Sequence, residues 1–164
     1  MSVNKIEKRY RDGTYLTNNP NWDRQDCLWK ANLVYNILNE FKIKLKSVCE
    51  IGCGTGDVLV HLKRFYPHCE FTGYDISPQL KQFWEEHKAD GIHFQCGDFL
   101  ELDKQNYDCI LLLDVIEHLS NPFHFLDAIQ KKAQYFVFHF PLDLSASTIM
   151  REKTLLNARA QVGH

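Results

Sequence analysis

A glycine-rich turn constrains this chain more than any other feature. Residues 48–57 read VCEIGCGTGD, a short apolar run with an acid, followed by three alternating glycines. Glycine lacks a Cβ atom, so it reaches positive φ and lets backbone N–H groups come close to a ligand. Where such a turn joins a strand to a helix, it forms the crevice in which an α/β sheet binds a nucleoside.

The spacing of the glycines narrows the class of ligand. The dinucleotide fingerprint is G-x-G-x-x-G, whereas Gly52, Gly54 and Gly56 form G-x-G-x-G followed directly by Asp57. This spacing argues against a cofactor with a pyrophosphate, such as NAD. A nucleoside without a pyrophosphate fits the turn better.

Strands and helices alternate along most of the chain. The residue pattern predicts strands at Ser47–Ile51, Glu70–Tyr74, His93–Cys96, Tyr107–Leu113 and Tyr135–Phe140. It predicts helices at Asp57–Phe65, Ser77–His87 and Asn121–Ala133. Alternating βαβ units imply a parallel sheet with right-handed crossovers. We therefore predict an α/β fold, a doubly wound Rossmann-like sheet that is mainly parallel and has helices on both faces.

The first 25 residues differ in character from the rest. They are polar and aromatic, with turn signals at Asp12-Gly13 and at residues 18–20, and they predict an irregular N-terminal arm. From Asp26 to Phe41, apolar residues recur at helical spacing. A chain of 164 residues with 45% hydrophobic content suits one core. We divide it into an arm, residues 1–25, and one ligand-binding domain, residues 26–164.

Composition excludes several classes of partner. The net charge of −2 gives no general electrostatic reason to bind nucleic acid or an anionic membrane. No run of eighteen apolar residues is present, and the N-terminus lacks the apolar segment of a signal peptide. The six cysteines form no C-x-x-C pair, which favours reduced thiols in a cytoplasmic protein. We expect no membrane partner.

Acidic residues follow three of the predicted strands. Asp75 follows the second strand directly, where a carboxylate can accept hydrogen bonds from both hydroxyls of a ribose. Its simpler role is to favour the dipole of the next helix. Asp98 follows the third strand, in a Gly-Asp pair that also suits an ordinary turn. Asp114 follows the fourth strand, at the sheet edge where open α/β folds bind ligands.

Taken in order, these motifs resemble those of class I S-adenosylmethionine (SAM)-dependent methyltransferases. The resemblance runs from Glu50 to Pro141 and includes EIGCGTG at residues 50–56 and DVIEHL at residues 114–119. The branch with the DVIEHL motif resembles the ubiquinone-pathway O-methyltransferase-like enzymes. The resemblance implies SAM as the cofactor and assigns cofactor binding to Glu50, Gly52, Cys53, Gly54, Gly56, Asp75, Ile76, Asp98, Phe99 and Asp114.

The resemblance also implies particular roles. Ile76 packs against the adenine ring, Asp98 contacts the adenine amino group, and Phe99 offers its backbone N–H to the ring. Asp114 faces the methionine part of the cofactor. The segment from Tyr15 to Ala31 resembles an arm that closes as a lid over the cofactor in a bacterial-type branch. Packing of the arm onto the sheet is an equally simple role.

The residue that removes the acceptor proton is less defined. His118 lies beside the cofactor motif and titrates near neutral pH, which suits a general base. Its alternative role is to hold its own loop by hydrogen bonds. In two similar subgroups, acids and a histidine of this loop bind a divalent metal. The equivalents are Asp114, Glu117 and His118, joined by His139 or His164, but we assign no metal ligand because many relatives with this loop are not known as metal enzymes.

The end of the chain suggests an incomplete sheet. Related folds continue past the fifth strand with a helix and an antiparallel hairpin, whereas this chain has a predicted helix at residues 145–160 and stops at His164. We expect the hairpin to be lacking, through truncation or replacement by a partner. The edge strand at Tyr135–Phe140 is then exposed and suits pairing in a homodimer.

These observations predict a SAM-dependent methyltransferase. We expect a small-molecule or sugar-like acceptor, methylated on oxygen by in-line displacement, with nucleic acid disfavoured as a partner. The alternatives are a catalytically silent SAM-binding scaffold and a metal-dependent 2′-O-methyltransferase of small RNA. A NAD-dependent oxidoreductase conflicts with the glycine spacing. Fold analogy does not specify the acceptor.

Overall fold

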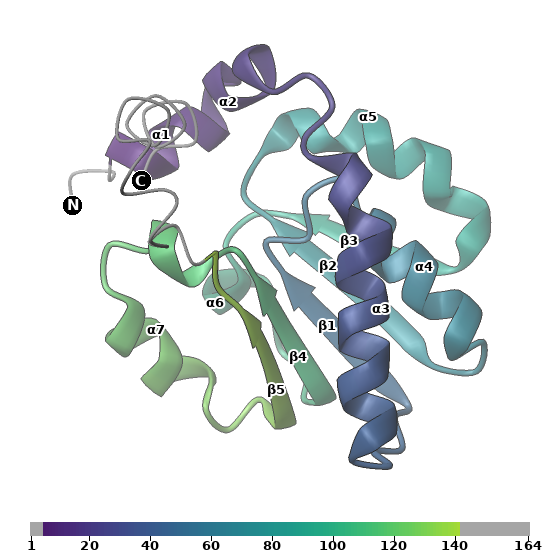
Figure 1. Ribbon diagram of the computed structural model, residues 1–164. Coiled ribbons are helices and arrows are strands. Elements are labelled where there is room, and N and C mark those ends of the chain that lie inside the picture. Colours follow the sequence, from purple (N-terminus) through teal and green to yellow (C-terminus); the bar gives the residue numbers. More distant parts are fainter. Residues whose placement is uncertain (1–4, 142–164) are drawn as a thin grey trace, which may run out of the picture.

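Five strands form one parallel sheet in the order β3-β2-β1-β4-β5 (Figure 1). The computed structural model describes residues 5–141 of the chain. The strands are β1 (Ser47–Ile51), β2 (Glu70–Asp75), β3 (Ile92–Cys96), β4 (Tyr107–Leu113) and β5 (Ala133–His139). The predicted Rossmann-like α/β fold is confirmed, and within residues 5–141 all strand pairs are parallel.

Helices cover both faces of this sheet. One face carries α3 (Arg24–Glu40), α4 (Asp57–Phe65) and α5 (Lys81–Trp84), the last flanked by the 3₁₀ helices η1 (Pro78–Leu80) and η2 (Glu85–Asp90). The other face carries α6 (Phe99–Leu102) and α7 (Pro122–Ile129). A third 3₁₀ helix, η3 (Ile116–His118), follows β4.

The predicted helix at residues 77–87 is interrupted. The segment begins with Pro78 as its first helical residue, as expected, but only α5 at its centre is an α-helix. Its buried apolar side chains are Leu80 and Trp84, and the residues of η2 that follow are mostly charged. An apolar face of so few residues stabilises an α-helix over little more than one turn.

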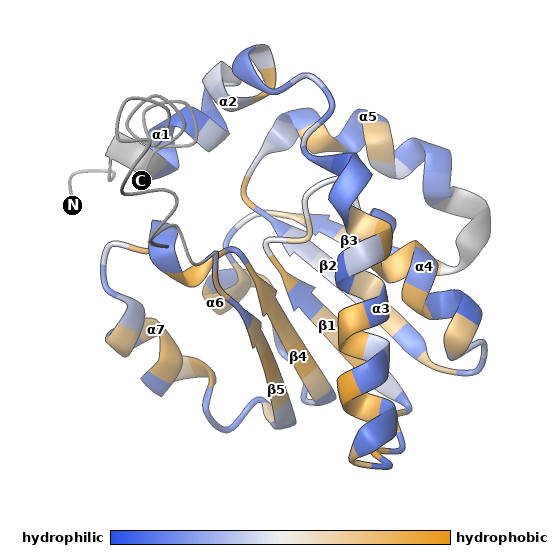
Figure 2. Cartoon of the chain, in the orientation of Figure 1, coloured by the Kyte–Doolittle hydropathy of each residue, from blue (hydrophilic) through white to orange (hydrophobic). Residues whose placement is uncertain are grey.

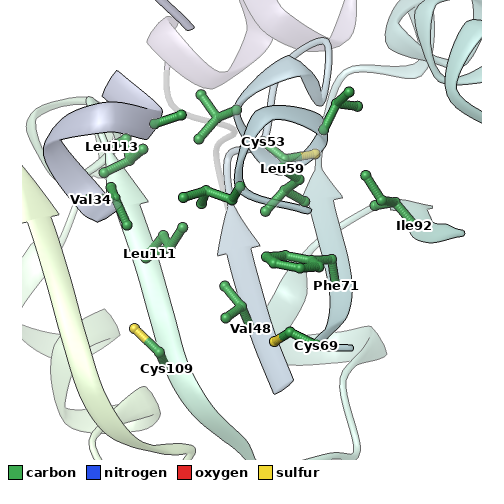
Figure 3. Close-up of a cluster of buried hydrophobic side chains, with 14 of the residues drawn as sticks. Val34, Val48, Cys53, Leu59, Cys69, Phe71, Ile92, Cys109, Leu111 and Leu113 are labelled. Atoms are coloured by element: carbon green, nitrogen blue, oxygen red, sulfur yellow. The ribbon is translucent and has the colours of Figure 1, made fainter. Parts of the chain in front are cut away.

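The sheet buries side chains on both of its faces. In β4, Cys109, Leu111 and Leu113 pack under α3, α4 and α5, as Figure 3 shows for this cluster. The alternate residues Ile110 and Leu112 pack under α6 and α7. Figure 2 shows that β4 is hydrophobic over most of its length, whereas α3 carries both hydrophobic and hydrophilic residues. The prediction of a central strand buried on both faces is confirmed.

The N-terminal arm differs from its prediction as an irregular segment. It contains two short helices, α1 (Lys5–Arg11) and α2 (Thr14–Asn18). The predicted turn at Gly13 separates them, because this residue has φ of 85° and the side chain of Asp12 accepts a hydrogen bond from the Thr14 backbone N–H. The turn signal was correct, but it marks a break between two helices.

The remaining predictions concern the C-terminal part of the chain and the edge of the sheet. The helix at 145–160 and the terminal His164 lie outside the described residues. Within residues 5–141, β5 pairs with β4 alone, so it is an edge strand there. In the same range, no helix combines the length and the apolar composition that crossing a membrane requires.

Truncation of Leu111 tests the central position of β4. This side chain is fully buried, so Leu111→Ala should lower the free energy of unfolding by about 2–5 kcal/mol through lost contacts and a residual cavity. The matched control Leu28→Ala removes a side chain that is 52% exposed and should change stability by less than about 1 kcal/mol. Equal losses in urea denaturation would contradict this placement of β4.

Candidate functional site

A cavity of about 390 Å³ lies at the carboxyl ends of the strands. Its wall includes the loops that follow β1, β2, β3 and β4, together with residues of the N-terminal arm, α3 and α7. Nine of the ten residues assigned to cofactor binding line it, and so does His118. The exception is Gly56, which is the N-cap residue of α4. The sequence motifs therefore converge on one place.

The glycine loop after β1 needs its glycines for backbone conformation and for space. Gly52, Gly54 and Gly56 all have positive φ, between 53° and 84°. A Cβ atom on Gly52 would lie 2.4 Å from a methyl carbon of Val115, in the loop after β4. The backbone N–H groups of Gly52 and Cys53 both donate to the carbonyl of Tyr74. The loop is thus closely packed between its neighbours on either side.

Asp75 joins the loops after β1 and β2. Its Oδ2 accepts a hydrogen bond from the Gly54 backbone N–H at 3.0 Å, and its Oδ1 accepts one from the Ser77 backbone N–H at 2.9 Å. The residue is buried, and burial raises the pKa of the carboxyl group, although these hydrogen bonds act in the opposite direction. Asp75 and the next residue, Ile76, both line the cavity.

Glu50 places a buried carboxyl group in the cavity wall. The residue is 3% exposed, and its Oε2 atom has no hydrogen-bond partner among the described residues. Burial raises the pKa of Glu50 to about 8, the Lys30 ammonium opposes this rise, and the carboxylates of Asp75 and Asp114 add to it. A polar group buried in this way is available to a ligand in the cavity.

Asp114 is held in an unusual conformation by two basic side chains. It has φ of 57°, which is uncommon for a residue other than glycine. Its Oδ2 lies 2.6 Å from Nζ of Lys30, which comes from α3, and its Oδ1 lies 2.5 Å from Nδ1 of His139, which ends β5. The ring of Trp29 meets the His139 ring edge to face at 5.6 Å.

The sequence-based assignment of site residues did not include Lys30. It lines the cavity, but its partner Asp114 is far away in the sequence, and the spacing of residues within α3 gives no sign of the pair. The one available signal was its position inside the Tyr15–Ala31 segment that resembles a lid.

Asp98 and Phe99 begin the short helix α6. Asp98 is its N-cap residue, and its Oδ1 accepts a hydrogen bond from the Leu100 backbone N–H at 2.8 Å. The ring of Phe99 is buried and meets Tyr74 edge to face at 5.1 Å. Both residues line the cavity. Capping of the helix therefore accompanies any contact that Asp98 makes with a ligand.

The N-terminal arm contributes aromatic rings to the cavity. Tyr10, Tyr15 and Trp22 line it and contact one another. The ring of His118 lies 5.7 Å from that of Tyr10, so this histidine faces the arm. Within residues 5–141, no group of three or more His, Cys, Asp or Glu side chains is arranged to hold a metal ion.

Comparisons with known proteins agree with this architecture. Residues 22–162 match the family model described as a methyltransferase domain. A tRNA U34 carboxymethyltransferase of Sulfurimonas denitrificans is 30% identical over 125 residues, which are 73% of this chain and 39% of that protein. A ubiquinone biosynthesis O-methyltransferase of Coxiella burnetii is 30% identical over 91 residues, 52% of this chain and 38% of that protein.

A solved structure shares the fold. The plantazolicin methyltransferase BpumL, in complex with a monoazolic desmethylPZN analog and SAH, has a TM-score of 0.66 at 20% identity and matches 95% of this chain and 60% of its own. The fold is that of the class I methyltransferases. The chain belongs to the methyltransferase domain family, as its motifs predicted. It spans less than half the length of the two curated relatives.

A pair of glycine substitutions tests the packing of the glycine loop. Gly52→Ala and Gly91→Ala both place an alanine at positive φ, but a Cβ on Gly91 has no atom within 4 Å. We expect Gly91→Ala to cost about 1–2 kcal/mol of stability through backbone strain alone. Gly52→Ala should cost about 1–3 kcal/mol more because its methyl group collides with Val115. Equal losses in thermal denaturation would contradict the close approach of the two loops.

Substitution of Glu50 tests its buried state through pH. Its folded-state pKa of about 8 exceeds the ordinary value of 4.5, so the folded chain binds more protons than the unfolded chain between these values. Wild-type stability should therefore fall as pH rises from 4.5 to about 8. Glu50→Gln should fall less steeply, whereas the control Glu101→Gln at an exposed position should follow the wild type. A Glu50→Gln variant with the wild-type slope in urea denaturation would contradict this assignment.

Proposed function

We propose that the chain binds SAM in this cavity and forms the donor-binding part of a SAM-dependent methyltransferase. The observation that carries the proposal is the convergence of four separate motifs on one cavity, namely the glycine loop, Asp75, Asp98 and Asp114. Membership of the methyltransferase domain family supports the same reaction. The structure of plantazolicin methyltransferase contains SAH, the demethylated form of SAM, which supports this class of ligand.

The charges in the cavity fit a nucleoside that carries an amino acid and a sulfonium. The unpartnered Oε2 of Glu50 is a buried acceptor suited to a positively charged group. Lys30, the one Lys or Arg among the described residues that line the cavity, is suited to a carboxylate. Asp114 lies beside Lys30, so an acceptor for the ammonium group and a donor for the carboxylate of the amino acid are close together.

The adenosine half has its own set of residues. Asp75 binds the ribose hydroxyls, because each of its oxygens accepts one backbone N–H and keeps a second lone pair. Ile76 packs on the adenine ring. Asp98 and the backbone N–H of Phe99 bind the polar edge of that ring. Gly52, Cys53 and Gly54 allow close approach of the backbone to the ligand.

The main contribution of the protein to the reaction is to align the acceptor with the methyl group of SAM. Bound SAM supplies a methyl group that its sulfonium already activates for displacement. The chain holds the acceptor in line with that methyl group and excludes water, and the arm of residues 1–25 serves as the lid. His118 receives the proton of the acceptor when the acceptor is a hydroxyl. His118 belongs to the loop after β4, and its ring contacts Tyr10 of the arm.

The acceptor is a small or sugar-like molecule, with oxygen as the methylated atom. The names of the relatives include both a tRNA and a quinone pathway, so they do not choose between acceptor classes. The charge favours the small molecule, because binding of a nucleic acid relies on Lys and Arg contacts to phosphate. Lys30 is the one Lys or Arg among the described residues that line the cavity, and the whole chain has a net charge of −2.

Two further expectations stay predictions. The first is a homodimer formed through the edge of β5, where Tyr135 and Phe138 are partly exposed. The second is a cytoplasmic location, which agrees with six free cysteines.

Substitution of Asp75 tests SAM binding. Asp75→Asn removes a charged acceptor, so the dissociation constant for SAM should rise about tenfold or more in isothermal titration calorimetry. The control Asp127→Asn, on the exposed side of α7, should bind SAM like the wild type. NAD should give no binding heat. A wild-type chain that binds NAD but not SAM would contradict the proposal, and SAM binding without methyl transfer to any acceptor would favour the silent scaffold.

A further inference from the structure

Three rings of the N-terminal arm, Tyr10, Tyr15 and Trp22, form an aromatic wall of the cavity. Tyr10 stacks on Tyr15 with ring centroids 4.7 Å apart, and Tyr15 meets Trp22 edge to face at 4.8 Å. At one end of the aromatic wall, ring atoms of Trp22 lie 3.1 Å from the position that a Cβ atom on Gly54 would occupy. At the other end, Tyr10 reaches the ring of His118. The aromatic wall therefore runs from the loop after β1 to the loop after β4.

Negative charge surrounds the aromatic wall. Apart from Glu50, whose raised pKa of about 8 leaves it mainly protonated near pH 7, the carboxyl groups that line the same cavity are those of Glu7, Asp23, Asp75, Asp98 and Asp114. Lys30 is the one Lys or Arg that lines it among the described residues, and its ammonium already pairs with Asp114. Such an excess of carboxylates favours a cationic ligand over a neutral one of the same shape.

The tyrosines of the aromatic wall offer uncharged rings. Burial raises the pKa of Tyr10, and the carboxylates of Asp75 and Glu117 raise it further. Burial and the neighbouring Asp23, which accepts a hydrogen bond from the Tyr15 hydroxyl at 3.0 Å, raise the pKa of Tyr15 in the same way. Both phenols remain neutral near pH 7, and the faces of neutral aromatic rings attract cations.

We propose that the aromatic wall recognises the positive charge on the sulfur of the methyl donor and so favours SAM over SAH. This inference rests on the proposed function and goes beyond it, because it gives the arm a role in specificity in addition to closure. Methyl transfer breaks the bond between sulfur and the methyl carbon, and the bonding electron pair stays on sulfur. The sulfonium becomes a neutral thioether, so the spent product loses its attraction to the rings.

A purely structural arm would behave differently. Rings that only pack the arm onto the sheet would, when removed, weaken the binding of SAM and SAH by the same factor. Rings that recognise the charge contribute to SAM binding alone. The ratio of the two dissociation constants therefore separates the two roles, even when a substitution also loosens the arm.

The test measures this ratio by isothermal titration calorimetry for the wild type and for paired variants. Tyr15→Leu and Trp22→Leu remove a ring, and the ratio of the SAH to the SAM dissociation constant should fall about threefold or more. Tyr15→Phe keeps the ring and loses only the hydroxyl, so its ratio should stay at the wild-type value. Tyr35→Leu removes a ring that stacks on Phe65 away from the cavity, and it should also leave the ratio unchanged.

A third ligand separates charge from shape. Sinefungin carries an ammonium group where SAM carries the methyl sulfonium. The leucine substitutions should therefore weaken the binding of sinefungin by about the same factor as the binding of SAM. If Tyr15→Leu does not fold by circular dichroism, Trp22→Leu gives the same measurement from a ring that is only partly buried. A ratio unchanged in the leucine variants of a chain that binds both ligands would overturn this inference alone. A wild-type chain that binds neither would overturn the proposed function as well.

Discussion

The buried carboxylate of Asp75 fixes the position of the loop after β1 relative to the loop after β2. One oxygen accepts the backbone N–H of Gly54 after β1, and the other accepts that of Ser77 after β2. The loop after β1 also donates two backbone N–H groups to Tyr74, the residue before Asp75. Because these bonds join adjacent parallel strands at their carboxyl ends, they place the glycine loop, and with it the floor of the cavity, relative to the sheet.

Contacts between Asp114 and two basic side chains organise the cavity wall beside β4. Asp114 follows the central strand β4 in a left-handed conformation, and its two oxygens are held by Lys30 and His139. Those partners come from α3 and β5, so the pair of contacts ties a helix and the edge strand to the same loop. Glu50 is a buried carboxyl group with one oxygen that no described residue satisfies. A cationic ligand would complete this arrangement.

Local signals made the fold predictable, and long-range contacts limited the prediction of the site. The bounds of β1, β4 and α4 agree with the sequence pattern, because apolar runs and a glycine turn mark them directly. The helical arm was missed, since its structure depends on rings such as Tyr10 and Tyr15 that meet across a turn. Lys30 was missed because its role exists only when α3 lies against β4. The acceptor has no local signal at all.

The most direct measurement of the central claim is a crystal structure of the chain grown with SAH. The account predicts the ribose hydroxyls at the carboxylate of Asp75, the adenine between Ile76 and Phe99, and the amino-acid end near Glu50 and Lys30. It also predicts the rings of the arm against the sulfur. A saturated crystal with SAH absent from this cavity, or with the adenosine placed away from Asp75, would contradict it.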